Sequence, residues 1–469
     1  MKRGAVLLTL VGIALPLSAS AQDAQFSVYG TLLPFVDNWH TTGATAPGVT
    51  PETGGASQVI AADYTGENQP NRFRVTSGTS NIGFRGELGF NEHIKAWFQV
   101  ECMTNPDGDT SVYASPWASR NSAVGLKGDF GTLFWGQWDT PYYYAAVFVG
   151  PLRGLNPFDN AVTGNPGFNV PVVATYGGRA TARADATFIR RQGNSIQYWT
   201  PTWNGLSARL AVGLNENRTR ASAYEPASNP WVLGALASYD YGPLSVRYAY
   251  QTHLDYFGLS WLGGSPGVTL TNPSSRDDGH EIVASVRLAT GTRLAVIAER
   301  LKYRTDELTP GLVNSYQRDA ILGAVQQRIG EHTLWGSFGY ARPGQCTMAG
   351  GGACSTNGLE GRQWSLGYTF SPAKTVDIYA AYYELANGRS GTHALFPPVV
   401  PITPGSTTRG AGVGILYIFD FTTKIGGPKP PPPAPVAPPE PPAAPPEAPA
   451  APPTPGPGGS EPAPPAPPT

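Results

Sequence analysis

The sequence predicts an all-β protein, a transmembrane β-barrel of about sixteen antiparallel strands. Three observations predict it. Segments of alternating apolar and polar residues recur along the chain, and the connections between them alternate between short and long. Beyond the first 17 residues, no apolar run reaches the ~18 residues of a membrane-spanning helix. Only helices and closed barrels cross lipid with every backbone polar group paired, so these observations together favour the barrel.

The N-terminus has the three parts of a secretory signal peptide. Met1-Lys2-Arg3 is basic, residues 4–17 are apolar and residues 18–21 are small, so cleavage is expected after Ala21. The apolar stretch is shorter than the ~20 residues that a membrane anchor needs. We therefore divide the chain into a signal peptide (1–21), a barrel domain (22–424) and a tail (425–469).

Composition excludes several functional classes. The chain is 14% charged with a formal net charge of -1, so it has no basic bias for nucleic acid. The histidines stand singly, without a nucleophile motif or metal-ligand spacing around them: His40, His93, His253, His280, His332 and His393. We interpret them as ordinary surface histidines in turns and loops, and we expect no enzyme activity, no cofactor and no metal.

Alternation between two faces is clearest in the segment 94–101. One parity carries Ile94, Ala96, Phe98 and Val100, whereas the other carries Lys, Trp, Gln and Glu. Such a strand presents one face to lipid and the other to water. Segments 206–214 and 363–370 repeat the pattern, which would also suit a soluble β-sandwich.

The lengths of the connections favour the barrel over the sandwich. Seven are tight turns, at 89–92, 128–131, 201–205, 241–243, 290–291, 330–332 and 371–374. Eight are long loops, at 38–78, 103–116, 139–190, 215–230, 253–278, 302–314, 342–359 and 386–408. Barrels of the bacterial outer membrane have short periplasmic turns and long extracellular loops, so both chain ends are expected on the periplasmic side.

The C-terminal part of the barrel is followed by a proline-rich tail. Val413, Ile415, Tyr417, Phe419 and Phe421 share one parity and predict the closing strand, while residues 428–469 are almost wholly Pro, Ala and Glu. Such a tail is expected to be extended and disordered in the periplasm. Two interpretations stay open: an inert spacer, or a tether that contacts the cell wall or a periplasmic partner.

The cysteines predict at most one disulfide. Cys346 and Cys354 lie close together in a glycine-rich loop and could pair in an oxidising compartment. We favour this disulfide over free thiols, and either over a metal site, which needs more ligands. Cys102 is then an unpaired wall residue.

Several segments match a known family in their order and spacing. They are Val28-Tyr29-Gly30, Ser77-Gly78, 83–89 (GFRGELG), 95–101 (KAWFQVE), 124–132 (VGLKGDFGT), Gly136, Thr140-Pro141, 194–198 (NSIQY), 366–368 (LGY) and 378–382 (IYAAY). On these residues the chain resembles the Gram-negative general porins of the kind found in Neisseria and Comamonas. The resemblance implies a sixteen-stranded barrel in outer-membrane lipid, usually a homotrimer, whose third long loop folds inward to narrow the pore. Residues 139–190 occupy the place of that loop.

A channel of this kind passes ions and small hydrophilic solutes without chemistry, so its inward-facing charges matter most. Parity places these side chains on the luminal face of the wall: Arg85, Lys95, Glu101, Arg191, Arg209, Arg247, Arg287, Arg293 and Glu299. The third loop adds Arg153, Arg179 and Arg183 against Asp139, Asp159 and Asp185. Because cations outnumber acids on the wall, we expect a mild anion preference, carried chiefly by Arg85 and Arg191, whose strands match the family's. The parity of Arg120 leaves its direction open.

A substrate-selective channel, for sugars or other small solutes, is the alternative function. Aromatic side chains of the third loop could stack on sugar rings: Tyr142, Tyr143, Tyr144 and Phe148. They could equally pin the loop to the wall.

Overall fold

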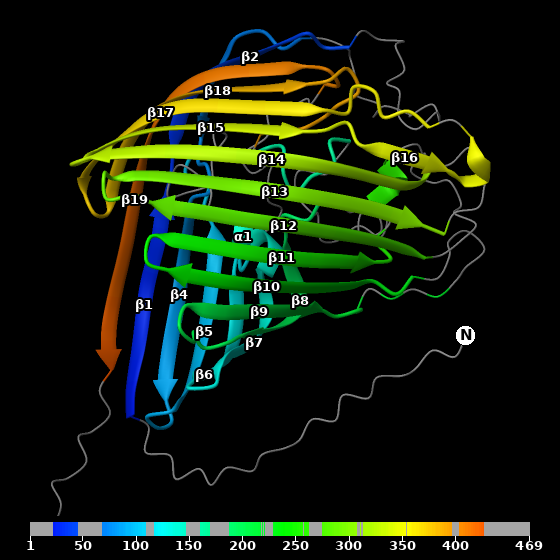
Figure 1. The fold of residues 1–469 in the computed structure, drawn as a ribbon. Helices are drawn as coiled ribbons and strands as arrows, with labels where there is room; N and C mark the ends of the chain where they lie inside the picture. The colour runs from blue at the N-terminus through cyan, green and yellow to red at the C-terminus, as the bar shows by residue number, and fades with distance from the viewer. Residues whose placement is uncertain are drawn as a thin grey trace, which may run out of the picture. The chain divides into compact units, whose positions relative to one another are not determined.

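The first and last strands of the chain pair with each other, which closes the sheet. In the computed structural model, β1 (Gln22–Leu32) runs antiparallel to β19 (Thr407–Ile425), from Ala24 opposite Ile425 to Leu32 opposite Tyr417. The neighbouring strands follow one another around a closed, tilted barrel (Figure 1).

The structure describes residues 22–45, 68–108, 117–146, 160–168, 187–216, 218, 220, 228–256, 258–261, 274–306, 310, 313–352, 354–395 and 403–425. The expected signal peptide and the tail beyond Ile425 lie outside these residues, so both stay predictions.

The described elements are mainly strands. Between β1 and β19 they are β2 (Phe35–Thr42), β3 (Arg72–Thr76), β4 (Asn81–Gly89), β5 (Ile94–Met103), β6 (Ser122–Gly128), β7 (Gly131–Asp139), β8 (Arg191–Trp199), β9 (Leu206–Gly213), β10 (Trp231–Tyr241), β11 (Leu244–Leu254), β12 (Ser275–Arg287), β13 (Thr292–Thr305), β14 (Val313–Ile329), β15 (His332–Ala341), β16 (Gln345–Met348), β17 (Gly361–Ala373) and β18 (Val376–Asn387). Three short helical segments accompany them: α1 (Pro141–Ala146), η3 (Gly258–Trp261) and η4 (Ala349–Gly351). Within the described ranges, no helix has the length and apolar character needed to span a membrane.

These segments make up sixteen strands of the barrel. We call each of the sixteen a stave, because some are interrupted and consist of two segments. β1 and β2 form one stave, because both pair with β19; β3 and β4 form the next, because they pair with β2 and β1. β15 and β16 form a third interrupted stave, because both pair with β14. The prediction of a sixteen-stranded antiparallel barrel is therefore confirmed.

The first two staves break at the same level for a local reason. Pro34 has no N–H for the ladder. On the neighbouring stave, Gly78 has a φ of +57°, and the Ser80 hydroxyl accepts a hydrogen bond from the backbone N–H of Leu33 at 2.8 Å. The N–H of Leu33 therefore has a side-chain acceptor at the level where the ladder is interrupted.

The tight turns lie where the sequence predicts them, but two of the expected long loops contain strands. Within 38–78 the chain continues as β2 and then β3, and within 342–359 it forms β16, which pairs with β14. These extensions were missed because a break separates each of them from the rest of its strand, and alternation over four or five residues is too short a signal.

Exposure follows the predicted parity. Leu366 is 58% exposed, whereas its neighbour Ser365 is fully buried on the other side of β17. The outward-facing side chains are apolar along the wall. Phe98, Ile282 and Val413 are exposed in the same way as Leu366. The wall therefore has an apolar face outside and a mixed face inside, which is the pattern of a barrel in lipid rather than of a sandwich.

Cys346 and Cys354 form a disulfide that closes the chain between β16 and β17. The bridge spans 8 residues, and the chain-entropy relation for so short a loop gives about 2.5 kcal/mol. We expect Cys354→Ser to lower the free energy of unfolding by that amount under oxidising conditions. Urea titrations with and without reductant measure it; an equal loss in wild type and variant on adding reductant would contradict the assignment.

Candidate functional site

The predicted wall charges lie on the inner face of the barrel, but on two different arcs. Arg85, Lys95 and Glu101 share parity with buried or half-buried luminal residues of β4 and β5. Arg209 and Arg247 face inward from β9 and β11, which form a second arc. The loop residues Arg153, Asp159, Arg179, Arg183 and Asp185 lie outside the described residues.

Ion pairs neutralise much of the first arc. Arg85 pairs with Asp420 of β19 and lies 4.8 Å from the Tyr29 ring. The sequence did not reveal this pair, because its members are 335 residues apart.

Glu101 is held by two partners. Arg120 pairs with it at 2.5 Å, and the Tyr29 hydroxyl donates a hydrogen bond to it at 3.0 Å. The direction of Arg120, which parity left open, is therefore toward the luminal carboxylates.

Arg191 and Asp139 form an ion pair where the third loop leaves and re-enters the wall. Their Nε–Oδ1 distance is 2.9 Å, and the Asn121 amide donates a hydrogen bond to Asp139 at 2.8 Å. The two loop ends are thereby held together.

The third loop begins with α1, whose three tyrosines contact the inner wall. α1 lies against β10 and β11 (Figure 1). Tyr142 is fully buried, and the guanidinium of Arg209 sits 3.3 Å from the Tyr144 ring and 3.9 Å from the Trp199 ring. Tyr142 packs in an apolar cluster with wall residues such as Leu236 and Val283.

A buried ion pair on β13 and β14 joins the loop to the wall. Glu299 and Arg318 are 3.1 Å apart with no exposed side-chain surface. Glu299 accepts hydrogen bonds from the Tyr142 hydroxyl at 2.7 Å and from the Gly164 N–H at 2.6 Å, while Arg318 donates to the carbonyl of Val162 at 3.0 Å. We call Glu299 and Arg318 the latch pair. The sequence placed Glu299 on the luminal face but missed Arg318, although its parity on β14 was the available signal.

The next part of the loop is held by a different part of the wall. The Ala161 N–H donates to the Gln363 side chain of β17 at 2.6 Å, and Val162 packs among apolar inner-wall residues. His393, from the loop between β18 and β19, lies 3.2 Å from the Ala161 carbonyl. The described parts of the third loop thus touch inward-facing residues on both sides of the barrel.

The interpretation of every histidine as a surface residue is wrong for His253 and His393. Both are buried, at 0% and 3% exposure, and His253 stacks on Phe188 at 4.4 Å. Burial, with the nearby charge of Arg318, lowers the pKa of His393 to about 3, so it is neutral at ordinary pH. In the described ranges, no three His, Cys, Asp or Glu side chains are arranged to hold a metal ion.

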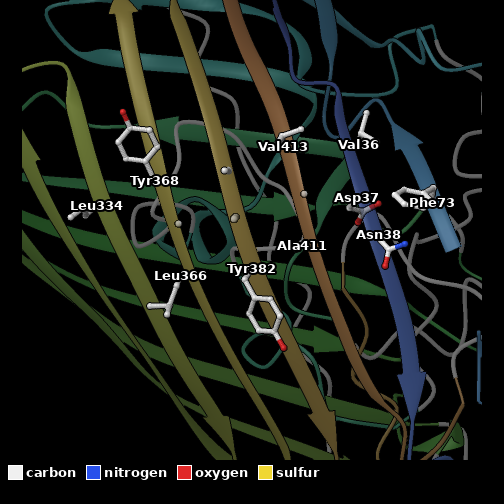
Figure 2. A pocket seen from close by; sticks show the side chains of 14 residues that line it. Val36, Asp37, Asn38, Phe73, Leu334, Leu366, Tyr368, Tyr382, Ala411 and Val413 are labelled. Carbon is white, nitrogen blue, oxygen red and sulfur yellow. The ribbon is translucent and has the colours of Figure 1, made fainter. Parts of the chain in front are cut away.

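A separate hollow lies on the outer face and is not part of the solute path. Its volume is about 680 Å³, and it crosses β15, β17, β18 and β19 to β2 and β3 (Figure 2). Small residues such as Ala380 and Ala411 form its floor, with Leu366, Tyr368 and Val413 around it. Because these side chains are outward and apolar, the hollow suits contact with hydrocarbon and not passage of water.

Known proteins are similar to this chain in sequence and architecture. Residues 6–390 match the sequence model of the Gram-negative porin family. The major outer membrane protein P.IA of Neisseria meningitidis is 26% identical over 309 residues, 62% of this chain and 74% of that protein. Outer membrane porin protein 32 of Delftia acidovorans is 26% identical over 359 residues, 73% of this chain and 86% of that protein.

Solved structures agree on the fold. The anion-selective porin from Comamonas acidovorans superposes with a TM-score of 0.59 at 17% identity, covering 84% of this chain and 100% of that one. Together with the closed sixteen-stave barrel and its apolar outer face, the matched residues show that this chain belongs to the Gram-negative porin family, the channel-forming proteins of the bacterial outer membrane.

Proposed function

We propose that the channel is a water-filled diffusion pore for ions and small hydrophilic solutes, with a mild preference for anions. The observation that carries this proposal is the distribution of charge on the inner wall. Three luminal acids are each paired with a cation, in the pairs Arg85–Asp420, Arg120–Glu101 and Arg191–Asp139. The second arc adds Arg209 and Arg247, and cations in a lumen favour the entry of anions.

Reversal potentials of the refolded protein in a planar bilayer test the preference. With a KCl gradient we expect a chloride-to-potassium permeability ratio above one, decreasing as the salt concentration rises because salt screens the wall charges. The Comamonas acidovorans porin of the same fold is anion-selective, which supports the same expectation. A ratio below one would reject the anion preference and leave the channel itself in place.

The structure does not favour the sugar-selective alternative. The loop tyrosines that could stack on sugar rings are engaged with the wall: Tyr142 with Glu299, and Tyr144 with Arg209. Tyr143 is 8% exposed and lies 5.8 Å from the Arg191 guanidinium. Phe148 lies outside the described residues. Liposome swelling with sugars and amino acids of matched size distinguishes a size filter from a selective channel.

Two further features belong to the proposal. We infer a homotrimer that acts without catalysis. One protein of similar fold, OmpT of Vibrio cholerae, has a trimer form; its TM-score is 0.50 at 13% identity. Light scattering of the detergent-solubilised protein tests the trimer.

The tail is proposed as a spacer or as a periplasmic tether, and sedimentation of full-length and 1–425 proteins with purified peptidoglycan tells these roles apart.

A further inference from the structure

The outer face of the barrel changes from apolar to basic toward the long-loop ends of β12, β13 and β14, which lie side by side (Figure 1). Nearer the short turns the outward side chains are apolar, and Ile282 and Ile321 are 53% and 49% exposed. Beyond them, toward the long loops, cations occupy outward positions: Arg276 in β12, Arg300, Lys302 and Arg304 in β13, and Arg342 directly after β15. We call these five residues the outer cation patch.

The patch faces away from the lumen. The side chain of Arg300 is 58% exposed, whereas the neighbouring Leu301 is fully buried on the inner side of β13. On β12 the side chain of Arg276 is 52% exposed, and the next residue, Asp277, is buried. These cations therefore do not line the solute path, and an anion preference of the channel does not explain them.

Strand register places the cations next to one another. Arg276 lies directly opposite Arg304, and Lys302 lies opposite Asp278. Like charges in opposite positions destabilise a sheet, but Asp278 offsets the repulsion. It pairs with Arg276 at 3.0 Å and with Arg304 at 2.6 Å. The Tyr250 hydroxyl donates a hydrogen bond to Asp278 at 2.8 Å, so one fixed carboxylate holds two guanidinium groups side by side.

A second carboxylate holds the other side of the patch. Arg300 pairs with Asp319 at 2.7 Å. The backbone N–H of Arg342 donates to the Asp319 carbonyl at 2.9 Å, and the Arg342 guanidinium interacts electrostatically with the Asp319 carboxylate. Neighbouring strands are about 4.8 Å apart, so the patch extends over roughly 15 Å from β12 to the end of β15.

Cations outnumber acids on this surface. Besides Asp278 and Asp319, the described residues here include one more carboxylate, Asp306, which lies beyond Arg304 and accepts a hydrogen bond from the Ser274 hydroxyl. In the part of the chain that the structure describes, Lys302 forms no ion pair. Five cations therefore stand against three carboxylates, and the patch keeps a positive charge.

The level of the patch matches that of lipid headgroups in the outer leaflet. Long loops mark the extracellular side of such barrels, and the apolar outer band marks the hydrocarbon. His280 lies at the boundary, opposite Arg300, and its Nδ1 is 2.9 Å from the hydroxyl of Tyr248. Tyrosine is typical of the membrane interface, so the cations of the patch lie where the hydrocarbon ends.

We propose that the outer cation patch binds the phosphate groups of a lipid in the outer leaflet, with the acyl chains of the lipid lying along Ile282 and Ile321. Guanidinium groups bind phosphate oxygens through paired N–H donors, and a lysine ammonium adds a point charge. A lipid fits better than a soluble anion because exposed apolar side chains continue directly from the cations. The proposal goes beyond solute diffusion, since it concerns the outside of the barrel.

Native mass spectrometry of the detergent-solubilised protein with phosphatidic acid tests the site. For the wild type we expect phosphatidic acid to bind at least tenfold more tightly than phosphatidylcholine with the same chains, whose choline cation offsets the phosphate charge. In Lys302→Gln/Arg304→Gln we expect the apparent Kd for phosphatidic acid to rise at least tenfold, because each cation near an anionic headgroup contributes to binding. Lys302→Arg/Arg304→Lys should bind like the wild type, since both charges are kept.

The matched control removes the same charge at the opposite end of the wall. Arg328 and Lys374 are exposed at the short-turn end, so Arg328→Gln/Lys374→Gln should bind phosphatidic acid as the wild type does. Equal affinity of the wild type and of Lys302→Gln/Arg304→Gln, or an equal loss in the control, would overturn the site. Heat-modifiable gel migration verifies that each variant is folded.

Glycerol phosphate distinguishes a lipid from a soluble phosphate, because it has the phosphate group without the chains. We expect a hundredfold excess of glycerol phosphate to leave phosphatidic acid bound. Displacement at equal concentration would show that the chains contribute nothing and would overturn the lipid assignment. None of these measurements depends on the ion selectivity of the channel.

Discussion

Replacing Arg318 by methionine is expected to lower the free energy of unfolding by about 3–5 kcal/mol and to release the third loop from the wall. The change leaves Glu299 buried without its cation, and it removes the hydrogen bond to the Val162 carbonyl. A loop freed at this point should give larger and noisier single-channel currents. Urea unfolding in detergent measures the first effect and planar-bilayer recording the second.

Arg300→Met is the matched control for the latch pair. Arg300 lies on β13 and pairs with Asp319 at 2.7 Å, but on the outer face, with 58% and 36% of the two side chains exposed. Exposed pairs contribute about 1 kcal/mol or less, so stability and current should stay close to those of the wild type. If Arg318→Met behaved like this control, the latch pair would not hold the loop.

The second large effect is expected at adjacent residues of β5 that face opposite sides of the wall. Phe98→Arg places a charge among lipid chains, which costs about 2–4 kcal/mol near the middle of the membrane. Phe98 is 41% exposed on the outer face and lies opposite Gly86 and Val124. Folding into lipid vesicles, followed by tryptophan fluorescence against urea, measures the loss.

Gln99→Arg carries the same new charge one residue later, on the luminal side. Gln99 donates a hydrogen bond to the Asn121 carbonyl at 2.9 Å, so the substitution removes one contact and adds a cation to the lumen. We expect a loss of about 1 kcal/mol and a higher chloride-to-potassium ratio. Equal destabilisation by the two substitutions would mean that the two faces of β5 do not differ as the barrel requires.

The sequence by itself determined the barrel fold and which side chains of its strands face lipid or the lumen. Period-two alternation is a local property, so Phe98 and Leu366 could be assigned to lipid and Arg209 to the lumen before any contact was known. The tight turns carry their own signal in glycine and proline. The extensions β3 and β16 were missed because four or five residues beside a break carry too little pattern.

Only the tertiary structure decided which charges meet. Arg85 meets Asp420, and Glu299 meets Arg318 and Tyr142, through closure of the sheet and inward folding of a loop, which join residues far apart in the chain. Alternation specifies the face of a residue, but the partner of a charge depends on register between strands and on loop packing, and neither leaves a local signal in the sequence.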